Sequence, residues 1–200
     1  MNKKIEPKAI QKAILAIDFQ EGLLEGIEHA QEVLQAAQKL LFAAQELNIP
    51  IIGTEQAPDL MGPTMPEWRE DFPYDIYSRS SFSALKNAEI SKAIEESNAQ
   101  EWILVGFETH ISLYQTARDL IQKGKKVILV NDATASSSIY DYSTALAALR
   151  DLGAQILSSE MLIFDWLQDI ENPCTDSVLG MLSVGQSDSS SCCSGGSCCK

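Results

Sequence analysis

Three side chains of different chemical type each come close after a short apolar segment of the chain. They are the carboxylate of Asp18, the guanidinium of Arg79 and the hydroxyl of Ser112. A carboxylate can act as an acid or a base, an arginine can hold an anion or an oxyanion, and a serine beside a base can act as a nucleophile. Ordinary structural roles are also open: a cap or buried ion pair for Asp18, a loop-edge charge for Arg79 and a helix N-cap for Ser112.

The periodicity of apolar residues predicts the elements that must position these groups. Strands are expected at residues 12–18, 51–54, 74–78, 102–106, 127–131 and 154–157. Helices are expected at residues 27–47, 87–97, 112–123, 141–152 and 160–168, and a Pro- and Gly-rich loop at residues 55–73. Because strands alternate with helices and the central strands are apolar throughout, the sequence predicts an α/β fold. The predicted fold has three layers, α/β/α: a Rossmann-like six-stranded parallel sheet with helices on both faces.

The residues that follow each predicted strand can be considered together, because ligands bind outside the carboxyl ends of parallel strands. These residues are Asp18, Phe19 and Gln20, then Thr54, Glu55 and Gln56, then Arg79, then residues 107–112, and finally Asn131 and Asp132. The sequence therefore predicts that Asp18, Arg79 and Ser112 converge on one site.

The composition narrows the range of partners. The chain has 200 residues, 45% of them hydrophobic and 22% charged, which is typical of one globular domain. Fifteen basic residues against 28 acidic ones give a net charge of −13, which argues against nucleic acid and anionic membranes. We see no signal-peptide pattern and no stretch near 18 apolar residues, so we expect no transmembrane segment and a cytoplasmic location.

The end of the sequence differs from the rest. A globular domain is expected over residues 1–171 and a flexible Ser/Gly/Cys-rich tail over residues 172–200. The tail carries four of the five cysteines, namely Cys192, Cys193, Cys198 and Cys199. Four thiolates can complete a Zn or Cu(I) site, while S-acylation, oxidation to disulfides and an unligated tail stay open. No metal site or cofactor is expected in the domain itself.

Four segments, in this order, resemble the isochorismatase-like hydrolase family, a superfamily of cysteine hydrolases. They read AILAIDFQ, GTEQAPDLMGPTMPE, YSRSSFSAL and ILVGFETHISLYQTARDLIQKGKKVILVNDATAS. The likeness is strongest to the branch of isochorismatase-domain-containing proteins and spans residues 12–168. Its most specific parts are the T-E-Q element at residues 54–56 and the G-x-E-x-H element that begins at residue 106. The family's fold agrees with the predicted strand–helix pattern.

The resemblance implies a catalytic triad of Asp, Lys and Cys. The Asp position falls on Asp18, the Lys position on Arg79 and the Cys position on Ser112, so two of the three residues depart from the family. A thiol has a pKa of about 8.5 that neighbours can lower, whereas a serine hydroxyl needs an adjacent base. An arginine stays protonated and cannot relay a proton as a lysine can. We therefore expect no efficient thiol-type amidase or nitrile chemistry.

The resemblance also implies a pocket beside the triad. Its residues are Phe107, Glu108, Thr109, His110 and Ile111, together with Gln20 and Gln56. The family often has a cis peptide bond before the E-x-H residues, which places a non-proline cis bond at or next to Phe107–Glu108 here. The backbone N–H groups of Ile111 and Ser112 are then expected to face the pocket as an oxyanion hole. His110 is expected to have a structural role in the strand–helix turn.

Two functions stay open. The first is a divergent hydrolase of a small carbonyl, amide or vinyl-ether substrate, because Asp18 is retained and true isochorismatases work without the thiol. The second is a catalytically silent relative, a small-molecule-binding or scaffold protein with a metal- or redox-active Cys tail. The departures at Arg79 and Ser112 favour the second function. For both, we expect a small-molecule ligand, and the resemblance implies a homo-oligomer, either a dimer or a tetramer.

Overall fold

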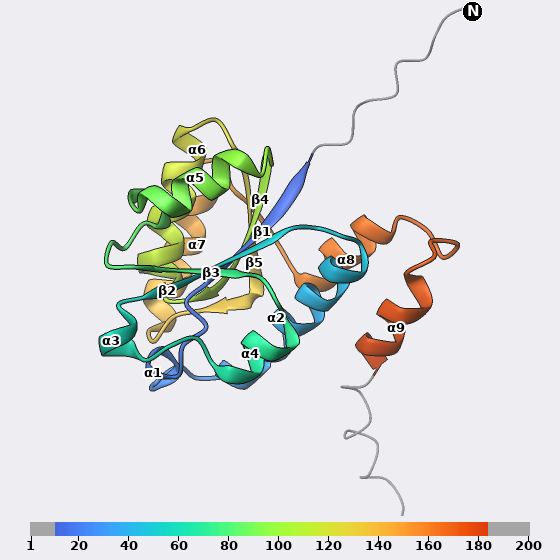
Figure 1. Cartoon of the computed structure of the whole chain (residues 1–200), viewed down its shortest axis with the longest axis horizontal. Helices are drawn as coiled ribbons and strands as arrows, with labels where there is room; N and C mark the ends of the chain where they lie inside the picture. Colours follow the sequence, from blue (N-terminus) through green and yellow to red (C-terminus); the bar gives the residue numbers. More distant parts are fainter. Residues whose placement is uncertain (1–10, 184–200) are drawn as a thin grey trace, which may run out of the picture.

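The computed structural model describes residues 11–183 and shows a three-layer α/β/α domain, which confirms the predicted fold (Figure 1). The strands are β1 (Lys12–Ile17), β2 (Ile51–Gln56), β3 (Asp75–Arg79), β4 (Glu101–Phe107), β5 (Lys126–Ala135) and β6 (Gln155–Leu157). They form one six-stranded sheet in the order β3-β2-β1-β4-β5-β6, and every neighbouring pair is parallel. The order reverses at β1 and β4, the place where doubly wound sheets bind ligands.

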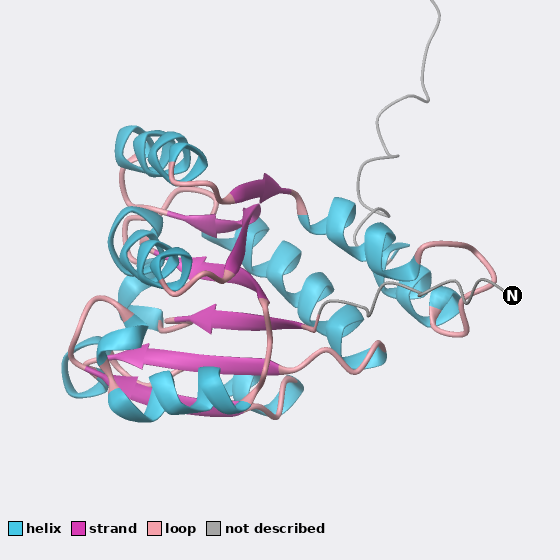
Figure 2. Ribbon diagram, turned by 90° about the horizontal axis from the view of Figure 1, so that it is seen from above, coloured by secondary structure: helices cyan, strands magenta, loops and turns pink. Residues whose placement is uncertain are grey.

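Helices cover both faces of this sheet (Figure 2). The longer ones are α2 (Ala30–Glu46), α5 (Ala88–Glu96), α6 (Tyr114–Gln122), α7 (Ile139–Asp151), α8 (Ser159–Leu167) and α9 (Thr175–Ser183). Short turns are α1 (Glu21–Leu24), α3 (Pro58–Met61), α4 (Pro66–Asp71), the 3₁₀ turn η1 (Ala84–Lys86) and the π-helical turn η2 (Thr109–Leu113). One hydrophobic core joins the sheet to α2 and α8, and the other joins it to α5, α6 and α7.

The sequence of β1 is apolar throughout from Ala13 to Ile17, as expected for a central strand that is buried on both faces. Successive side chains of a strand point to opposite faces, so a strand buried on both sides is apolar throughout. In β1, Ile14 packs in the core beneath α2, and Leu15 packs in the core beneath α5 and α6. Both side chains are fully buried. The run KAILAI therefore holds the two cores together and delivers Asp18 to the carboxyl edge of the sheet.

The strand β5 is longer than predicted. Its pairing with β4 shifts register between Leu104 and Gly106, so that Gly106 lies opposite Thr134 and β5 continues to Ala135. Asn131 and Asp132, which were expected at the end of this strand, lie within the observed β5. Asp132 accepts hydrogen bonds from the N–H and Oγ of Ser159 at 2.8 and 2.7 Å. The residues that follow β5 are therefore Ser136–Ser138 and not Asn131 and Asp132.

The segment of residues 57–71, predicted as a loop, contains α3 and α4. Trp68 of α4 is 1% exposed and stacks on Phe19, with ring centroids 3.9 Å apart. Phe19 in turn meets Phe107 edge to face at 5.5 Å. Aromatic stacking thus fixes α4 beside the residues that follow β1 and β4.

Helical structure also continues past residue 171, where the sequence predicted an irregular tail. Helix α9 spans Thr175–Ser183, and its buried Val178 joins the core beneath α2. The predicted boundary at residue 172 is therefore too early. The four clustered cysteines, Cys192, Cys193, Cys198 and Cys199, lie outside the described residues, and the Zn or Cu(I) site stays a prediction. Between residues 11 and 183, no helix has both the length and the apolar character to cross a bilayer.

Candidate functional site

Asp18 begins the site at the carboxyl end of β1. Its backbone is left-handed, with φ of 61°, and the residue is 1% exposed. Thr54 donates a hydrogen bond from its Oγ1 to Asp18 Oδ1 at 2.8 Å. Beside it, Gly106 has φ of 133°, and a Cβ there would lie only 1.9 Å from the carbonyl oxygen of Ile17. This glycine lets β4 pass close to β1 and brings the turn after β4 next to Asp18.

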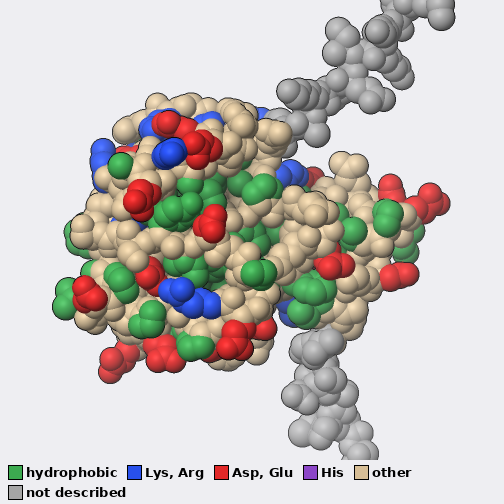
Figure 3. Space-filling view, viewed as in Figure 1, with side chains coloured by type: hydrophobic (Ala, Val, Ile, Leu, Met, Phe, Trp, Pro, Cys, Tyr) green, Lys and Arg blue, Asp and Glu red, His purple; other side chains and the backbone are tan. Residues whose placement is uncertain are grey.

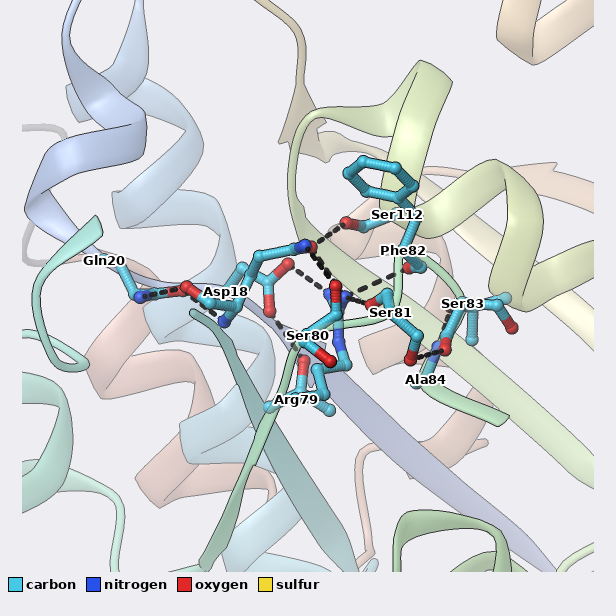
Figure 4. A network of polar contacts seen from close by, with 12 residues as sticks. Asp18, Gln20, Arg79, Ser80, Ser81, Phe82, Ser83, Ala84 and Ser112 are labelled. Atoms are coloured by element: carbon cyan, nitrogen blue, oxygen red, sulfur yellow. Dashed lines mark hydrogen bonds and ion pairs between the residues drawn. The ribbon is translucent and has the colours of Figure 1, made fainter. Parts of the chain in front are cut away.

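Arg79 ends β3 and fills the centre of the site (Figure 4). Its Nη2 forms an ion pair with Asp18 Oδ2, and side-chain exposure is 0% for Arg79 and 1% for Asp18. Its Nη1 donates to Gln56 Oε1 at 2.7 Å, to the carbonyl oxygen of Phe82 at 3.1 Å and to the carbonyl oxygen of Ser81. The guanidinium is thus held from both sides, and only its buried Nε makes no hydrogen bond within the described chain.

Ser112 lies in the π-helical turn η2, opposite Arg79. Its hydroxyl donates to Gln56 Oε1 at 3.3 Å, and the residue is 4% exposed. The amide oxygen of Gln56 therefore accepts from both Arg79 and Ser112. The structure brings Asp18, Arg79 and Ser112 together into one buried polar network, with Gln56 as the bridge.

Burial and pairing act in opposite directions on the charges of this network. Burial raises the pKa of Asp18, while the Arg79 charge and hydrogen bonds from Thr54 and Ser112 lower it, and the net shift is upward. Burial lowers the pKa of Arg79, while Asp18 raises it. A guanidinium starts from so high a value that Arg79 stays protonated at neutral pH. The pair is therefore an ion pair in a desolvated environment.

Gln20, predicted as a pocket residue, holds the end of β2 in place. Its side chain is fully buried and pairs with the backbone of Gln56 at two points. Gln20 Oε1 accepts from the N–H of Gln56 at 2.7 Å, and Gln20 Nε2 donates to the carbonyl oxygen of Gln56 at 3.1 Å. A further hydrogen bond runs from Nε2 to the carbonyl oxygen of Gly62. Gln20 thereby fixes the backbone from which Gln56 reaches Arg79 and Ser112.

The turn after β4 differs from the expected oxyanion hole. Residues 11–183 contain no cis peptide bond, so the expected cis bond at or next to Phe107–Glu108 is wrong. The chain turns instead at Glu108, whose φ is 54°. The N–H groups of Ile111 and Ser112 donate to the carbonyl oxygen of Glu108 at 2.9 and 3.1 Å. These two donors close the turn and are not free to bind an oxyanion.

The other residues of this turn contact β5 and the core. Phe107 is fully buried beside Phe19, and Thr109 Oγ1 donates to the carbonyl oxygen of Ala135 at 3.0 Å. The imidazole Nδ1 of His110 lies 3.1 Å from Ser136 Oγ and 3.2 Å from Glu108 Oε2. No hydrogen bond links His110 to Ser112 in the described part of the chain. Ile111 is half-buried within the same turn.

Two further polar groups were not assigned a role from the sequence. Glu55 accepts hydrogen bonds from the N–H of Thr64 at 3.0 Å and from Ser78 Oγ and Arg69 Nη2, both at 2.8 Å. This carboxylate fixes the segment of α3 and α4 against β3. Ser136, which contacts His110, becomes visible as a site residue only once the true end of β5 is known. Within residues 11–183, no three His, Cys, Asp or Glu side chains are grouped as metal ligands.

The sheet and the site define a doubly wound α/β protein with a polar network at the switch point of its parallel sheet. The family model described as "Isochorismatase domain" matches residues 12–161, and the chain belongs to this family. Isochorismatase domain-containing protein 2 of Xenopus laevis is 35% identical over 159 residues, which cover 78% of this chain and 76% of the relative.

Solved structures agree with this membership. The MAR1 ribonuclease of Caenorhabditis elegans is 27% identical, with a TM-score of 0.82 over 95% of this chain and 98% of its own. The YcaC gene product of Escherichia coli, described as an octameric hydrolase of unknown specificity, is 24% identical. It superposes with a TM-score of 0.81 over 89% of this chain and 91% of its own, and the likeness shows a shared fold.

Proposed function

We propose that the family's reaction centre is catalytically silent in this chain, and that the domain acts as a small-molecule-binding protein. The observation that carries the proposal is the buried guanidinium of Arg79, which is bound on two sides by Asp18 and Gln56. The family triad needs a carboxylate and a lysine that activate a thiol. Here both charged partners are fully engaged with each other, and the thiol is replaced by Ser112.

Ser112 has only a weak base beside it. Its hydroxyl donates to the amide oxygen of Gln56, which is not basic, and its other polar contact is the carboxylate of Asp18. Asp18 is neutralised electrostatically by Arg79 and also accepts from Thr54. An arginine cannot act as the proton relay that a lysine provides. The network therefore supports a structural role for the three residues more strongly than a hydrolytic one.

A hollow at the same edge of the sheet supports ligand binding. It has a volume of about 680 Å³ and lies between residues 28–33, at the start of α2, and the segment that joins β5 to α7. Its walls combine apolar groups such as Val33 with hydroxyl groups such as those of Ser136 and Tyr142. This mixture and this size are typical of sites for small organic molecules.

The proposal extends to partners and location. One structural relative is named a ribonuclease, but a net charge of −13 here opposes contact with a phosphate backbone. Basic side chains form no continuous patch on the face shown in Figure 3. We propose that this chain binds no nucleic acid, forms a homo-oligomer and is located in the cytoplasm. The octameric state given for the YcaC gene product supports self-association of this fold.

A binding experiment tests the ligand-binding part. Thermal unfolding of the full chain is measured with a library of small uncharged and carboxylate-bearing molecules, for the wild type and for Ser137→Trp, which fills the hollow. We expect hits that raise the Tm of the wild type and not that of the variant. Gly124→Ala is a matched control far from the hollow. An absence of hits, or hits that stabilise both proteins equally, would contradict the proposal.

A further inference from the structure

A nucleophile, a base and an acid lie together beside the family's triad and include none of its three residues. Ser136 follows β5 and lines the hollow, and His110 and Glu108 come from the turn after β4. The His110 Nδ1 atom is 3.1 Å from Ser136 Oγ, within the distance required for proton transfer by a general base. Glu108 Oε2 is 3.2 Å from the same nitrogen.

The hydrogen bonds of Ser136 indicate where its proton points. The backbone N–H of His110 donates to Ser136 Oγ at 3.4 Å, so the serine oxygen is an acceptor in that contact. Its own hydroxyl proton is then free to be donated to the imidazole Nδ1 at 3.1 Å. This requires the neutral tautomer that carries its proton on Nε2. The same backbone N–H would stabilise the serine oxygen as its proton leaves.

The carboxylate of Glu108 supplies the third part. Its Oε2 is buried and has no hydrogen-bond donor among the described residues other than the ring nitrogen of His110, which lies 3.2 Å away. A buried carboxylate oxygen without a donor is costly unless a positive charge compensates it. Transfer of the serine proton to His110 creates that charge 3.2 Å away. The unpartnered oxygen therefore stabilises the imidazolium state and not the resting one.

We propose that Ser136 is a nucleophile, with His110 as its base, toward small uncharged carboxylic esters bound in the hollow. The proposal rests on the proposed function only in using the hollow as a ligand site. Glu28 lines the hollow and Glu108 lies beside His110, and these carboxylates disfavour anionic substrates. The N-terminus of α7, a helix of 13 residues capped by Ser138, also lines the hollow, and its first N–H groups can bind a developing oxyanion.

The reaction proceeds in two steps. Ser136 Oγ forms a bond to the ester carbonyl carbon while its proton passes to His110 Nδ1. The carbon–alkoxy bond then breaks, and the leaving alkoxide takes the proton from His110. Water next attacks the acyl carbon and gives a proton to His110, and the bond to Ser136 Oγ breaks as the serine takes that proton back. The products are one carboxylic acid and one alcohol.

Labelling of the full-length protein with an alkyl fluorophosphonate tests this proposal, since the probe forms a Ser Oγ–P bond and loses fluoride. We expect mass spectrometry to place the adduct on Ser136. Labelling should be lost in Ser136→Ala and kept in Ser143→Ala, a control at an exposed serine of α7 that does not line the hollow. Labelling of His110→Ala should be slower by a factor of about 100 or more, the usual contribution of a general base.

Two further measurements distinguish reaction at Ser136 from reaction at Ser112 or at a cysteine. Ser112→Ala should label at the wild-type rate, because the family's centre takes no part. Hydrolysis of p-nitrophenyl acetate, measured after the cysteines are blocked with iodoacetamide, should fall with Ser136→Ala and with His110→Ala and should stay at the wild-type rate with Ser112→Ala. The absence of an adduct on Ser136, or an equal labelling rate in a folded His110→Ala variant, would overturn the proposal. If library ligands bind the hollow while Ser136 stays unlabelled, this inference fails and the proposed binding function survives.

Discussion

The buried ion pair of Asp18 and Arg79 makes a quantitative prediction about stability. Asp18→Asn keeps the shape of the side chain, and asparagine tolerates the left-handed backbone at this position. The change leaves the guanidinium at 0% side-chain exposure without its counter-charge. Breaking one partner of a buried pair costs about 3–5 kcal/mol. At about 2–4 °C per kcal/mol for a chain of this size, the Tm should fall by about 6–20 °C.

The reverse change and the double variant complete the test. Arg79→Met should also destabilise the protein, whereas Asp18→Asn combined with Arg79→Met removes both charges. The double variant should lose clearly less stability than the sum of the two single losses, since neither charge is left buried without its partner. A loss remains, because Gln56 and the carbonyl oxygens of residues 81 and 82 lose their donor. Urea unfolding at pH 7 with a reductant measures all four proteins. Additive losses in the double variant would refute the account of a structural ion pair.

The remaining predictions concern Glu55 and Gly106, which position the segments beside the Asp18–Arg79 pair. Glu55→Gln should lower stability at pH 7 by about 1–3 kcal/mol, because an amide cannot accept every bond that the carboxylate accepts. Burial raises the pKa of Glu55, but hydrogen bonds from Thr64 and Ser78 and the Arg69 charge outweigh it and hold the pKa below the usual value of a glutamate. Its contribution is present above pH 4.5 and lost as the pH falls, so urea unfolding between pH 6 and 3 should show a shallower decline for Glu55→Gln. Gly106→Ala should prevent folding, as circular dichroism would show, because its Cβ meets the Ile17 carbonyl oxygen at 1.9 Å. The control Gly124→Ala has open space and should cost only about 1–2 kcal/mol.

Much of the fold is predictable because its strands are buried on both faces. A run such as KAILAI cannot be solvated on either side, so its place at the centre of a parallel sheet follows from the sequence. The meeting of Asp18, Arg79 and Ser112 follows in turn, because the carboxyl ends of such strands share one edge.

The parts that could not be predicted depend on tertiary contacts. The extension of β5 to Ala135 requires a register shift against β4, which no local pattern encodes. The helix α4 starts with Pro66 and Glu67, which are ordinary signals for a helix start, but it has only six residues and is fixed by the stacking of Trp68 on Phe19. The pairing of His110 with Ser136 emerges only when both turns are placed side by side. The full engagement of Arg79 by carbonyl oxygens likewise depends on the path of residues 81 and 82.

Turnover tests the central claim, a silent family centre, most directly. Small amides, esters and vinyl ethers, including isochorismate, are offered to the wild type, to Ser112→Ala and to the charge-free double variant Asp18→Asn with Arg79→Met. We expect the same rate for all three proteins with every substrate, whether that rate is background or arises at Ser136. A substrate that the wild type turns over, with a loss of tenfold or more in either variant while it remains folded, would contradict it.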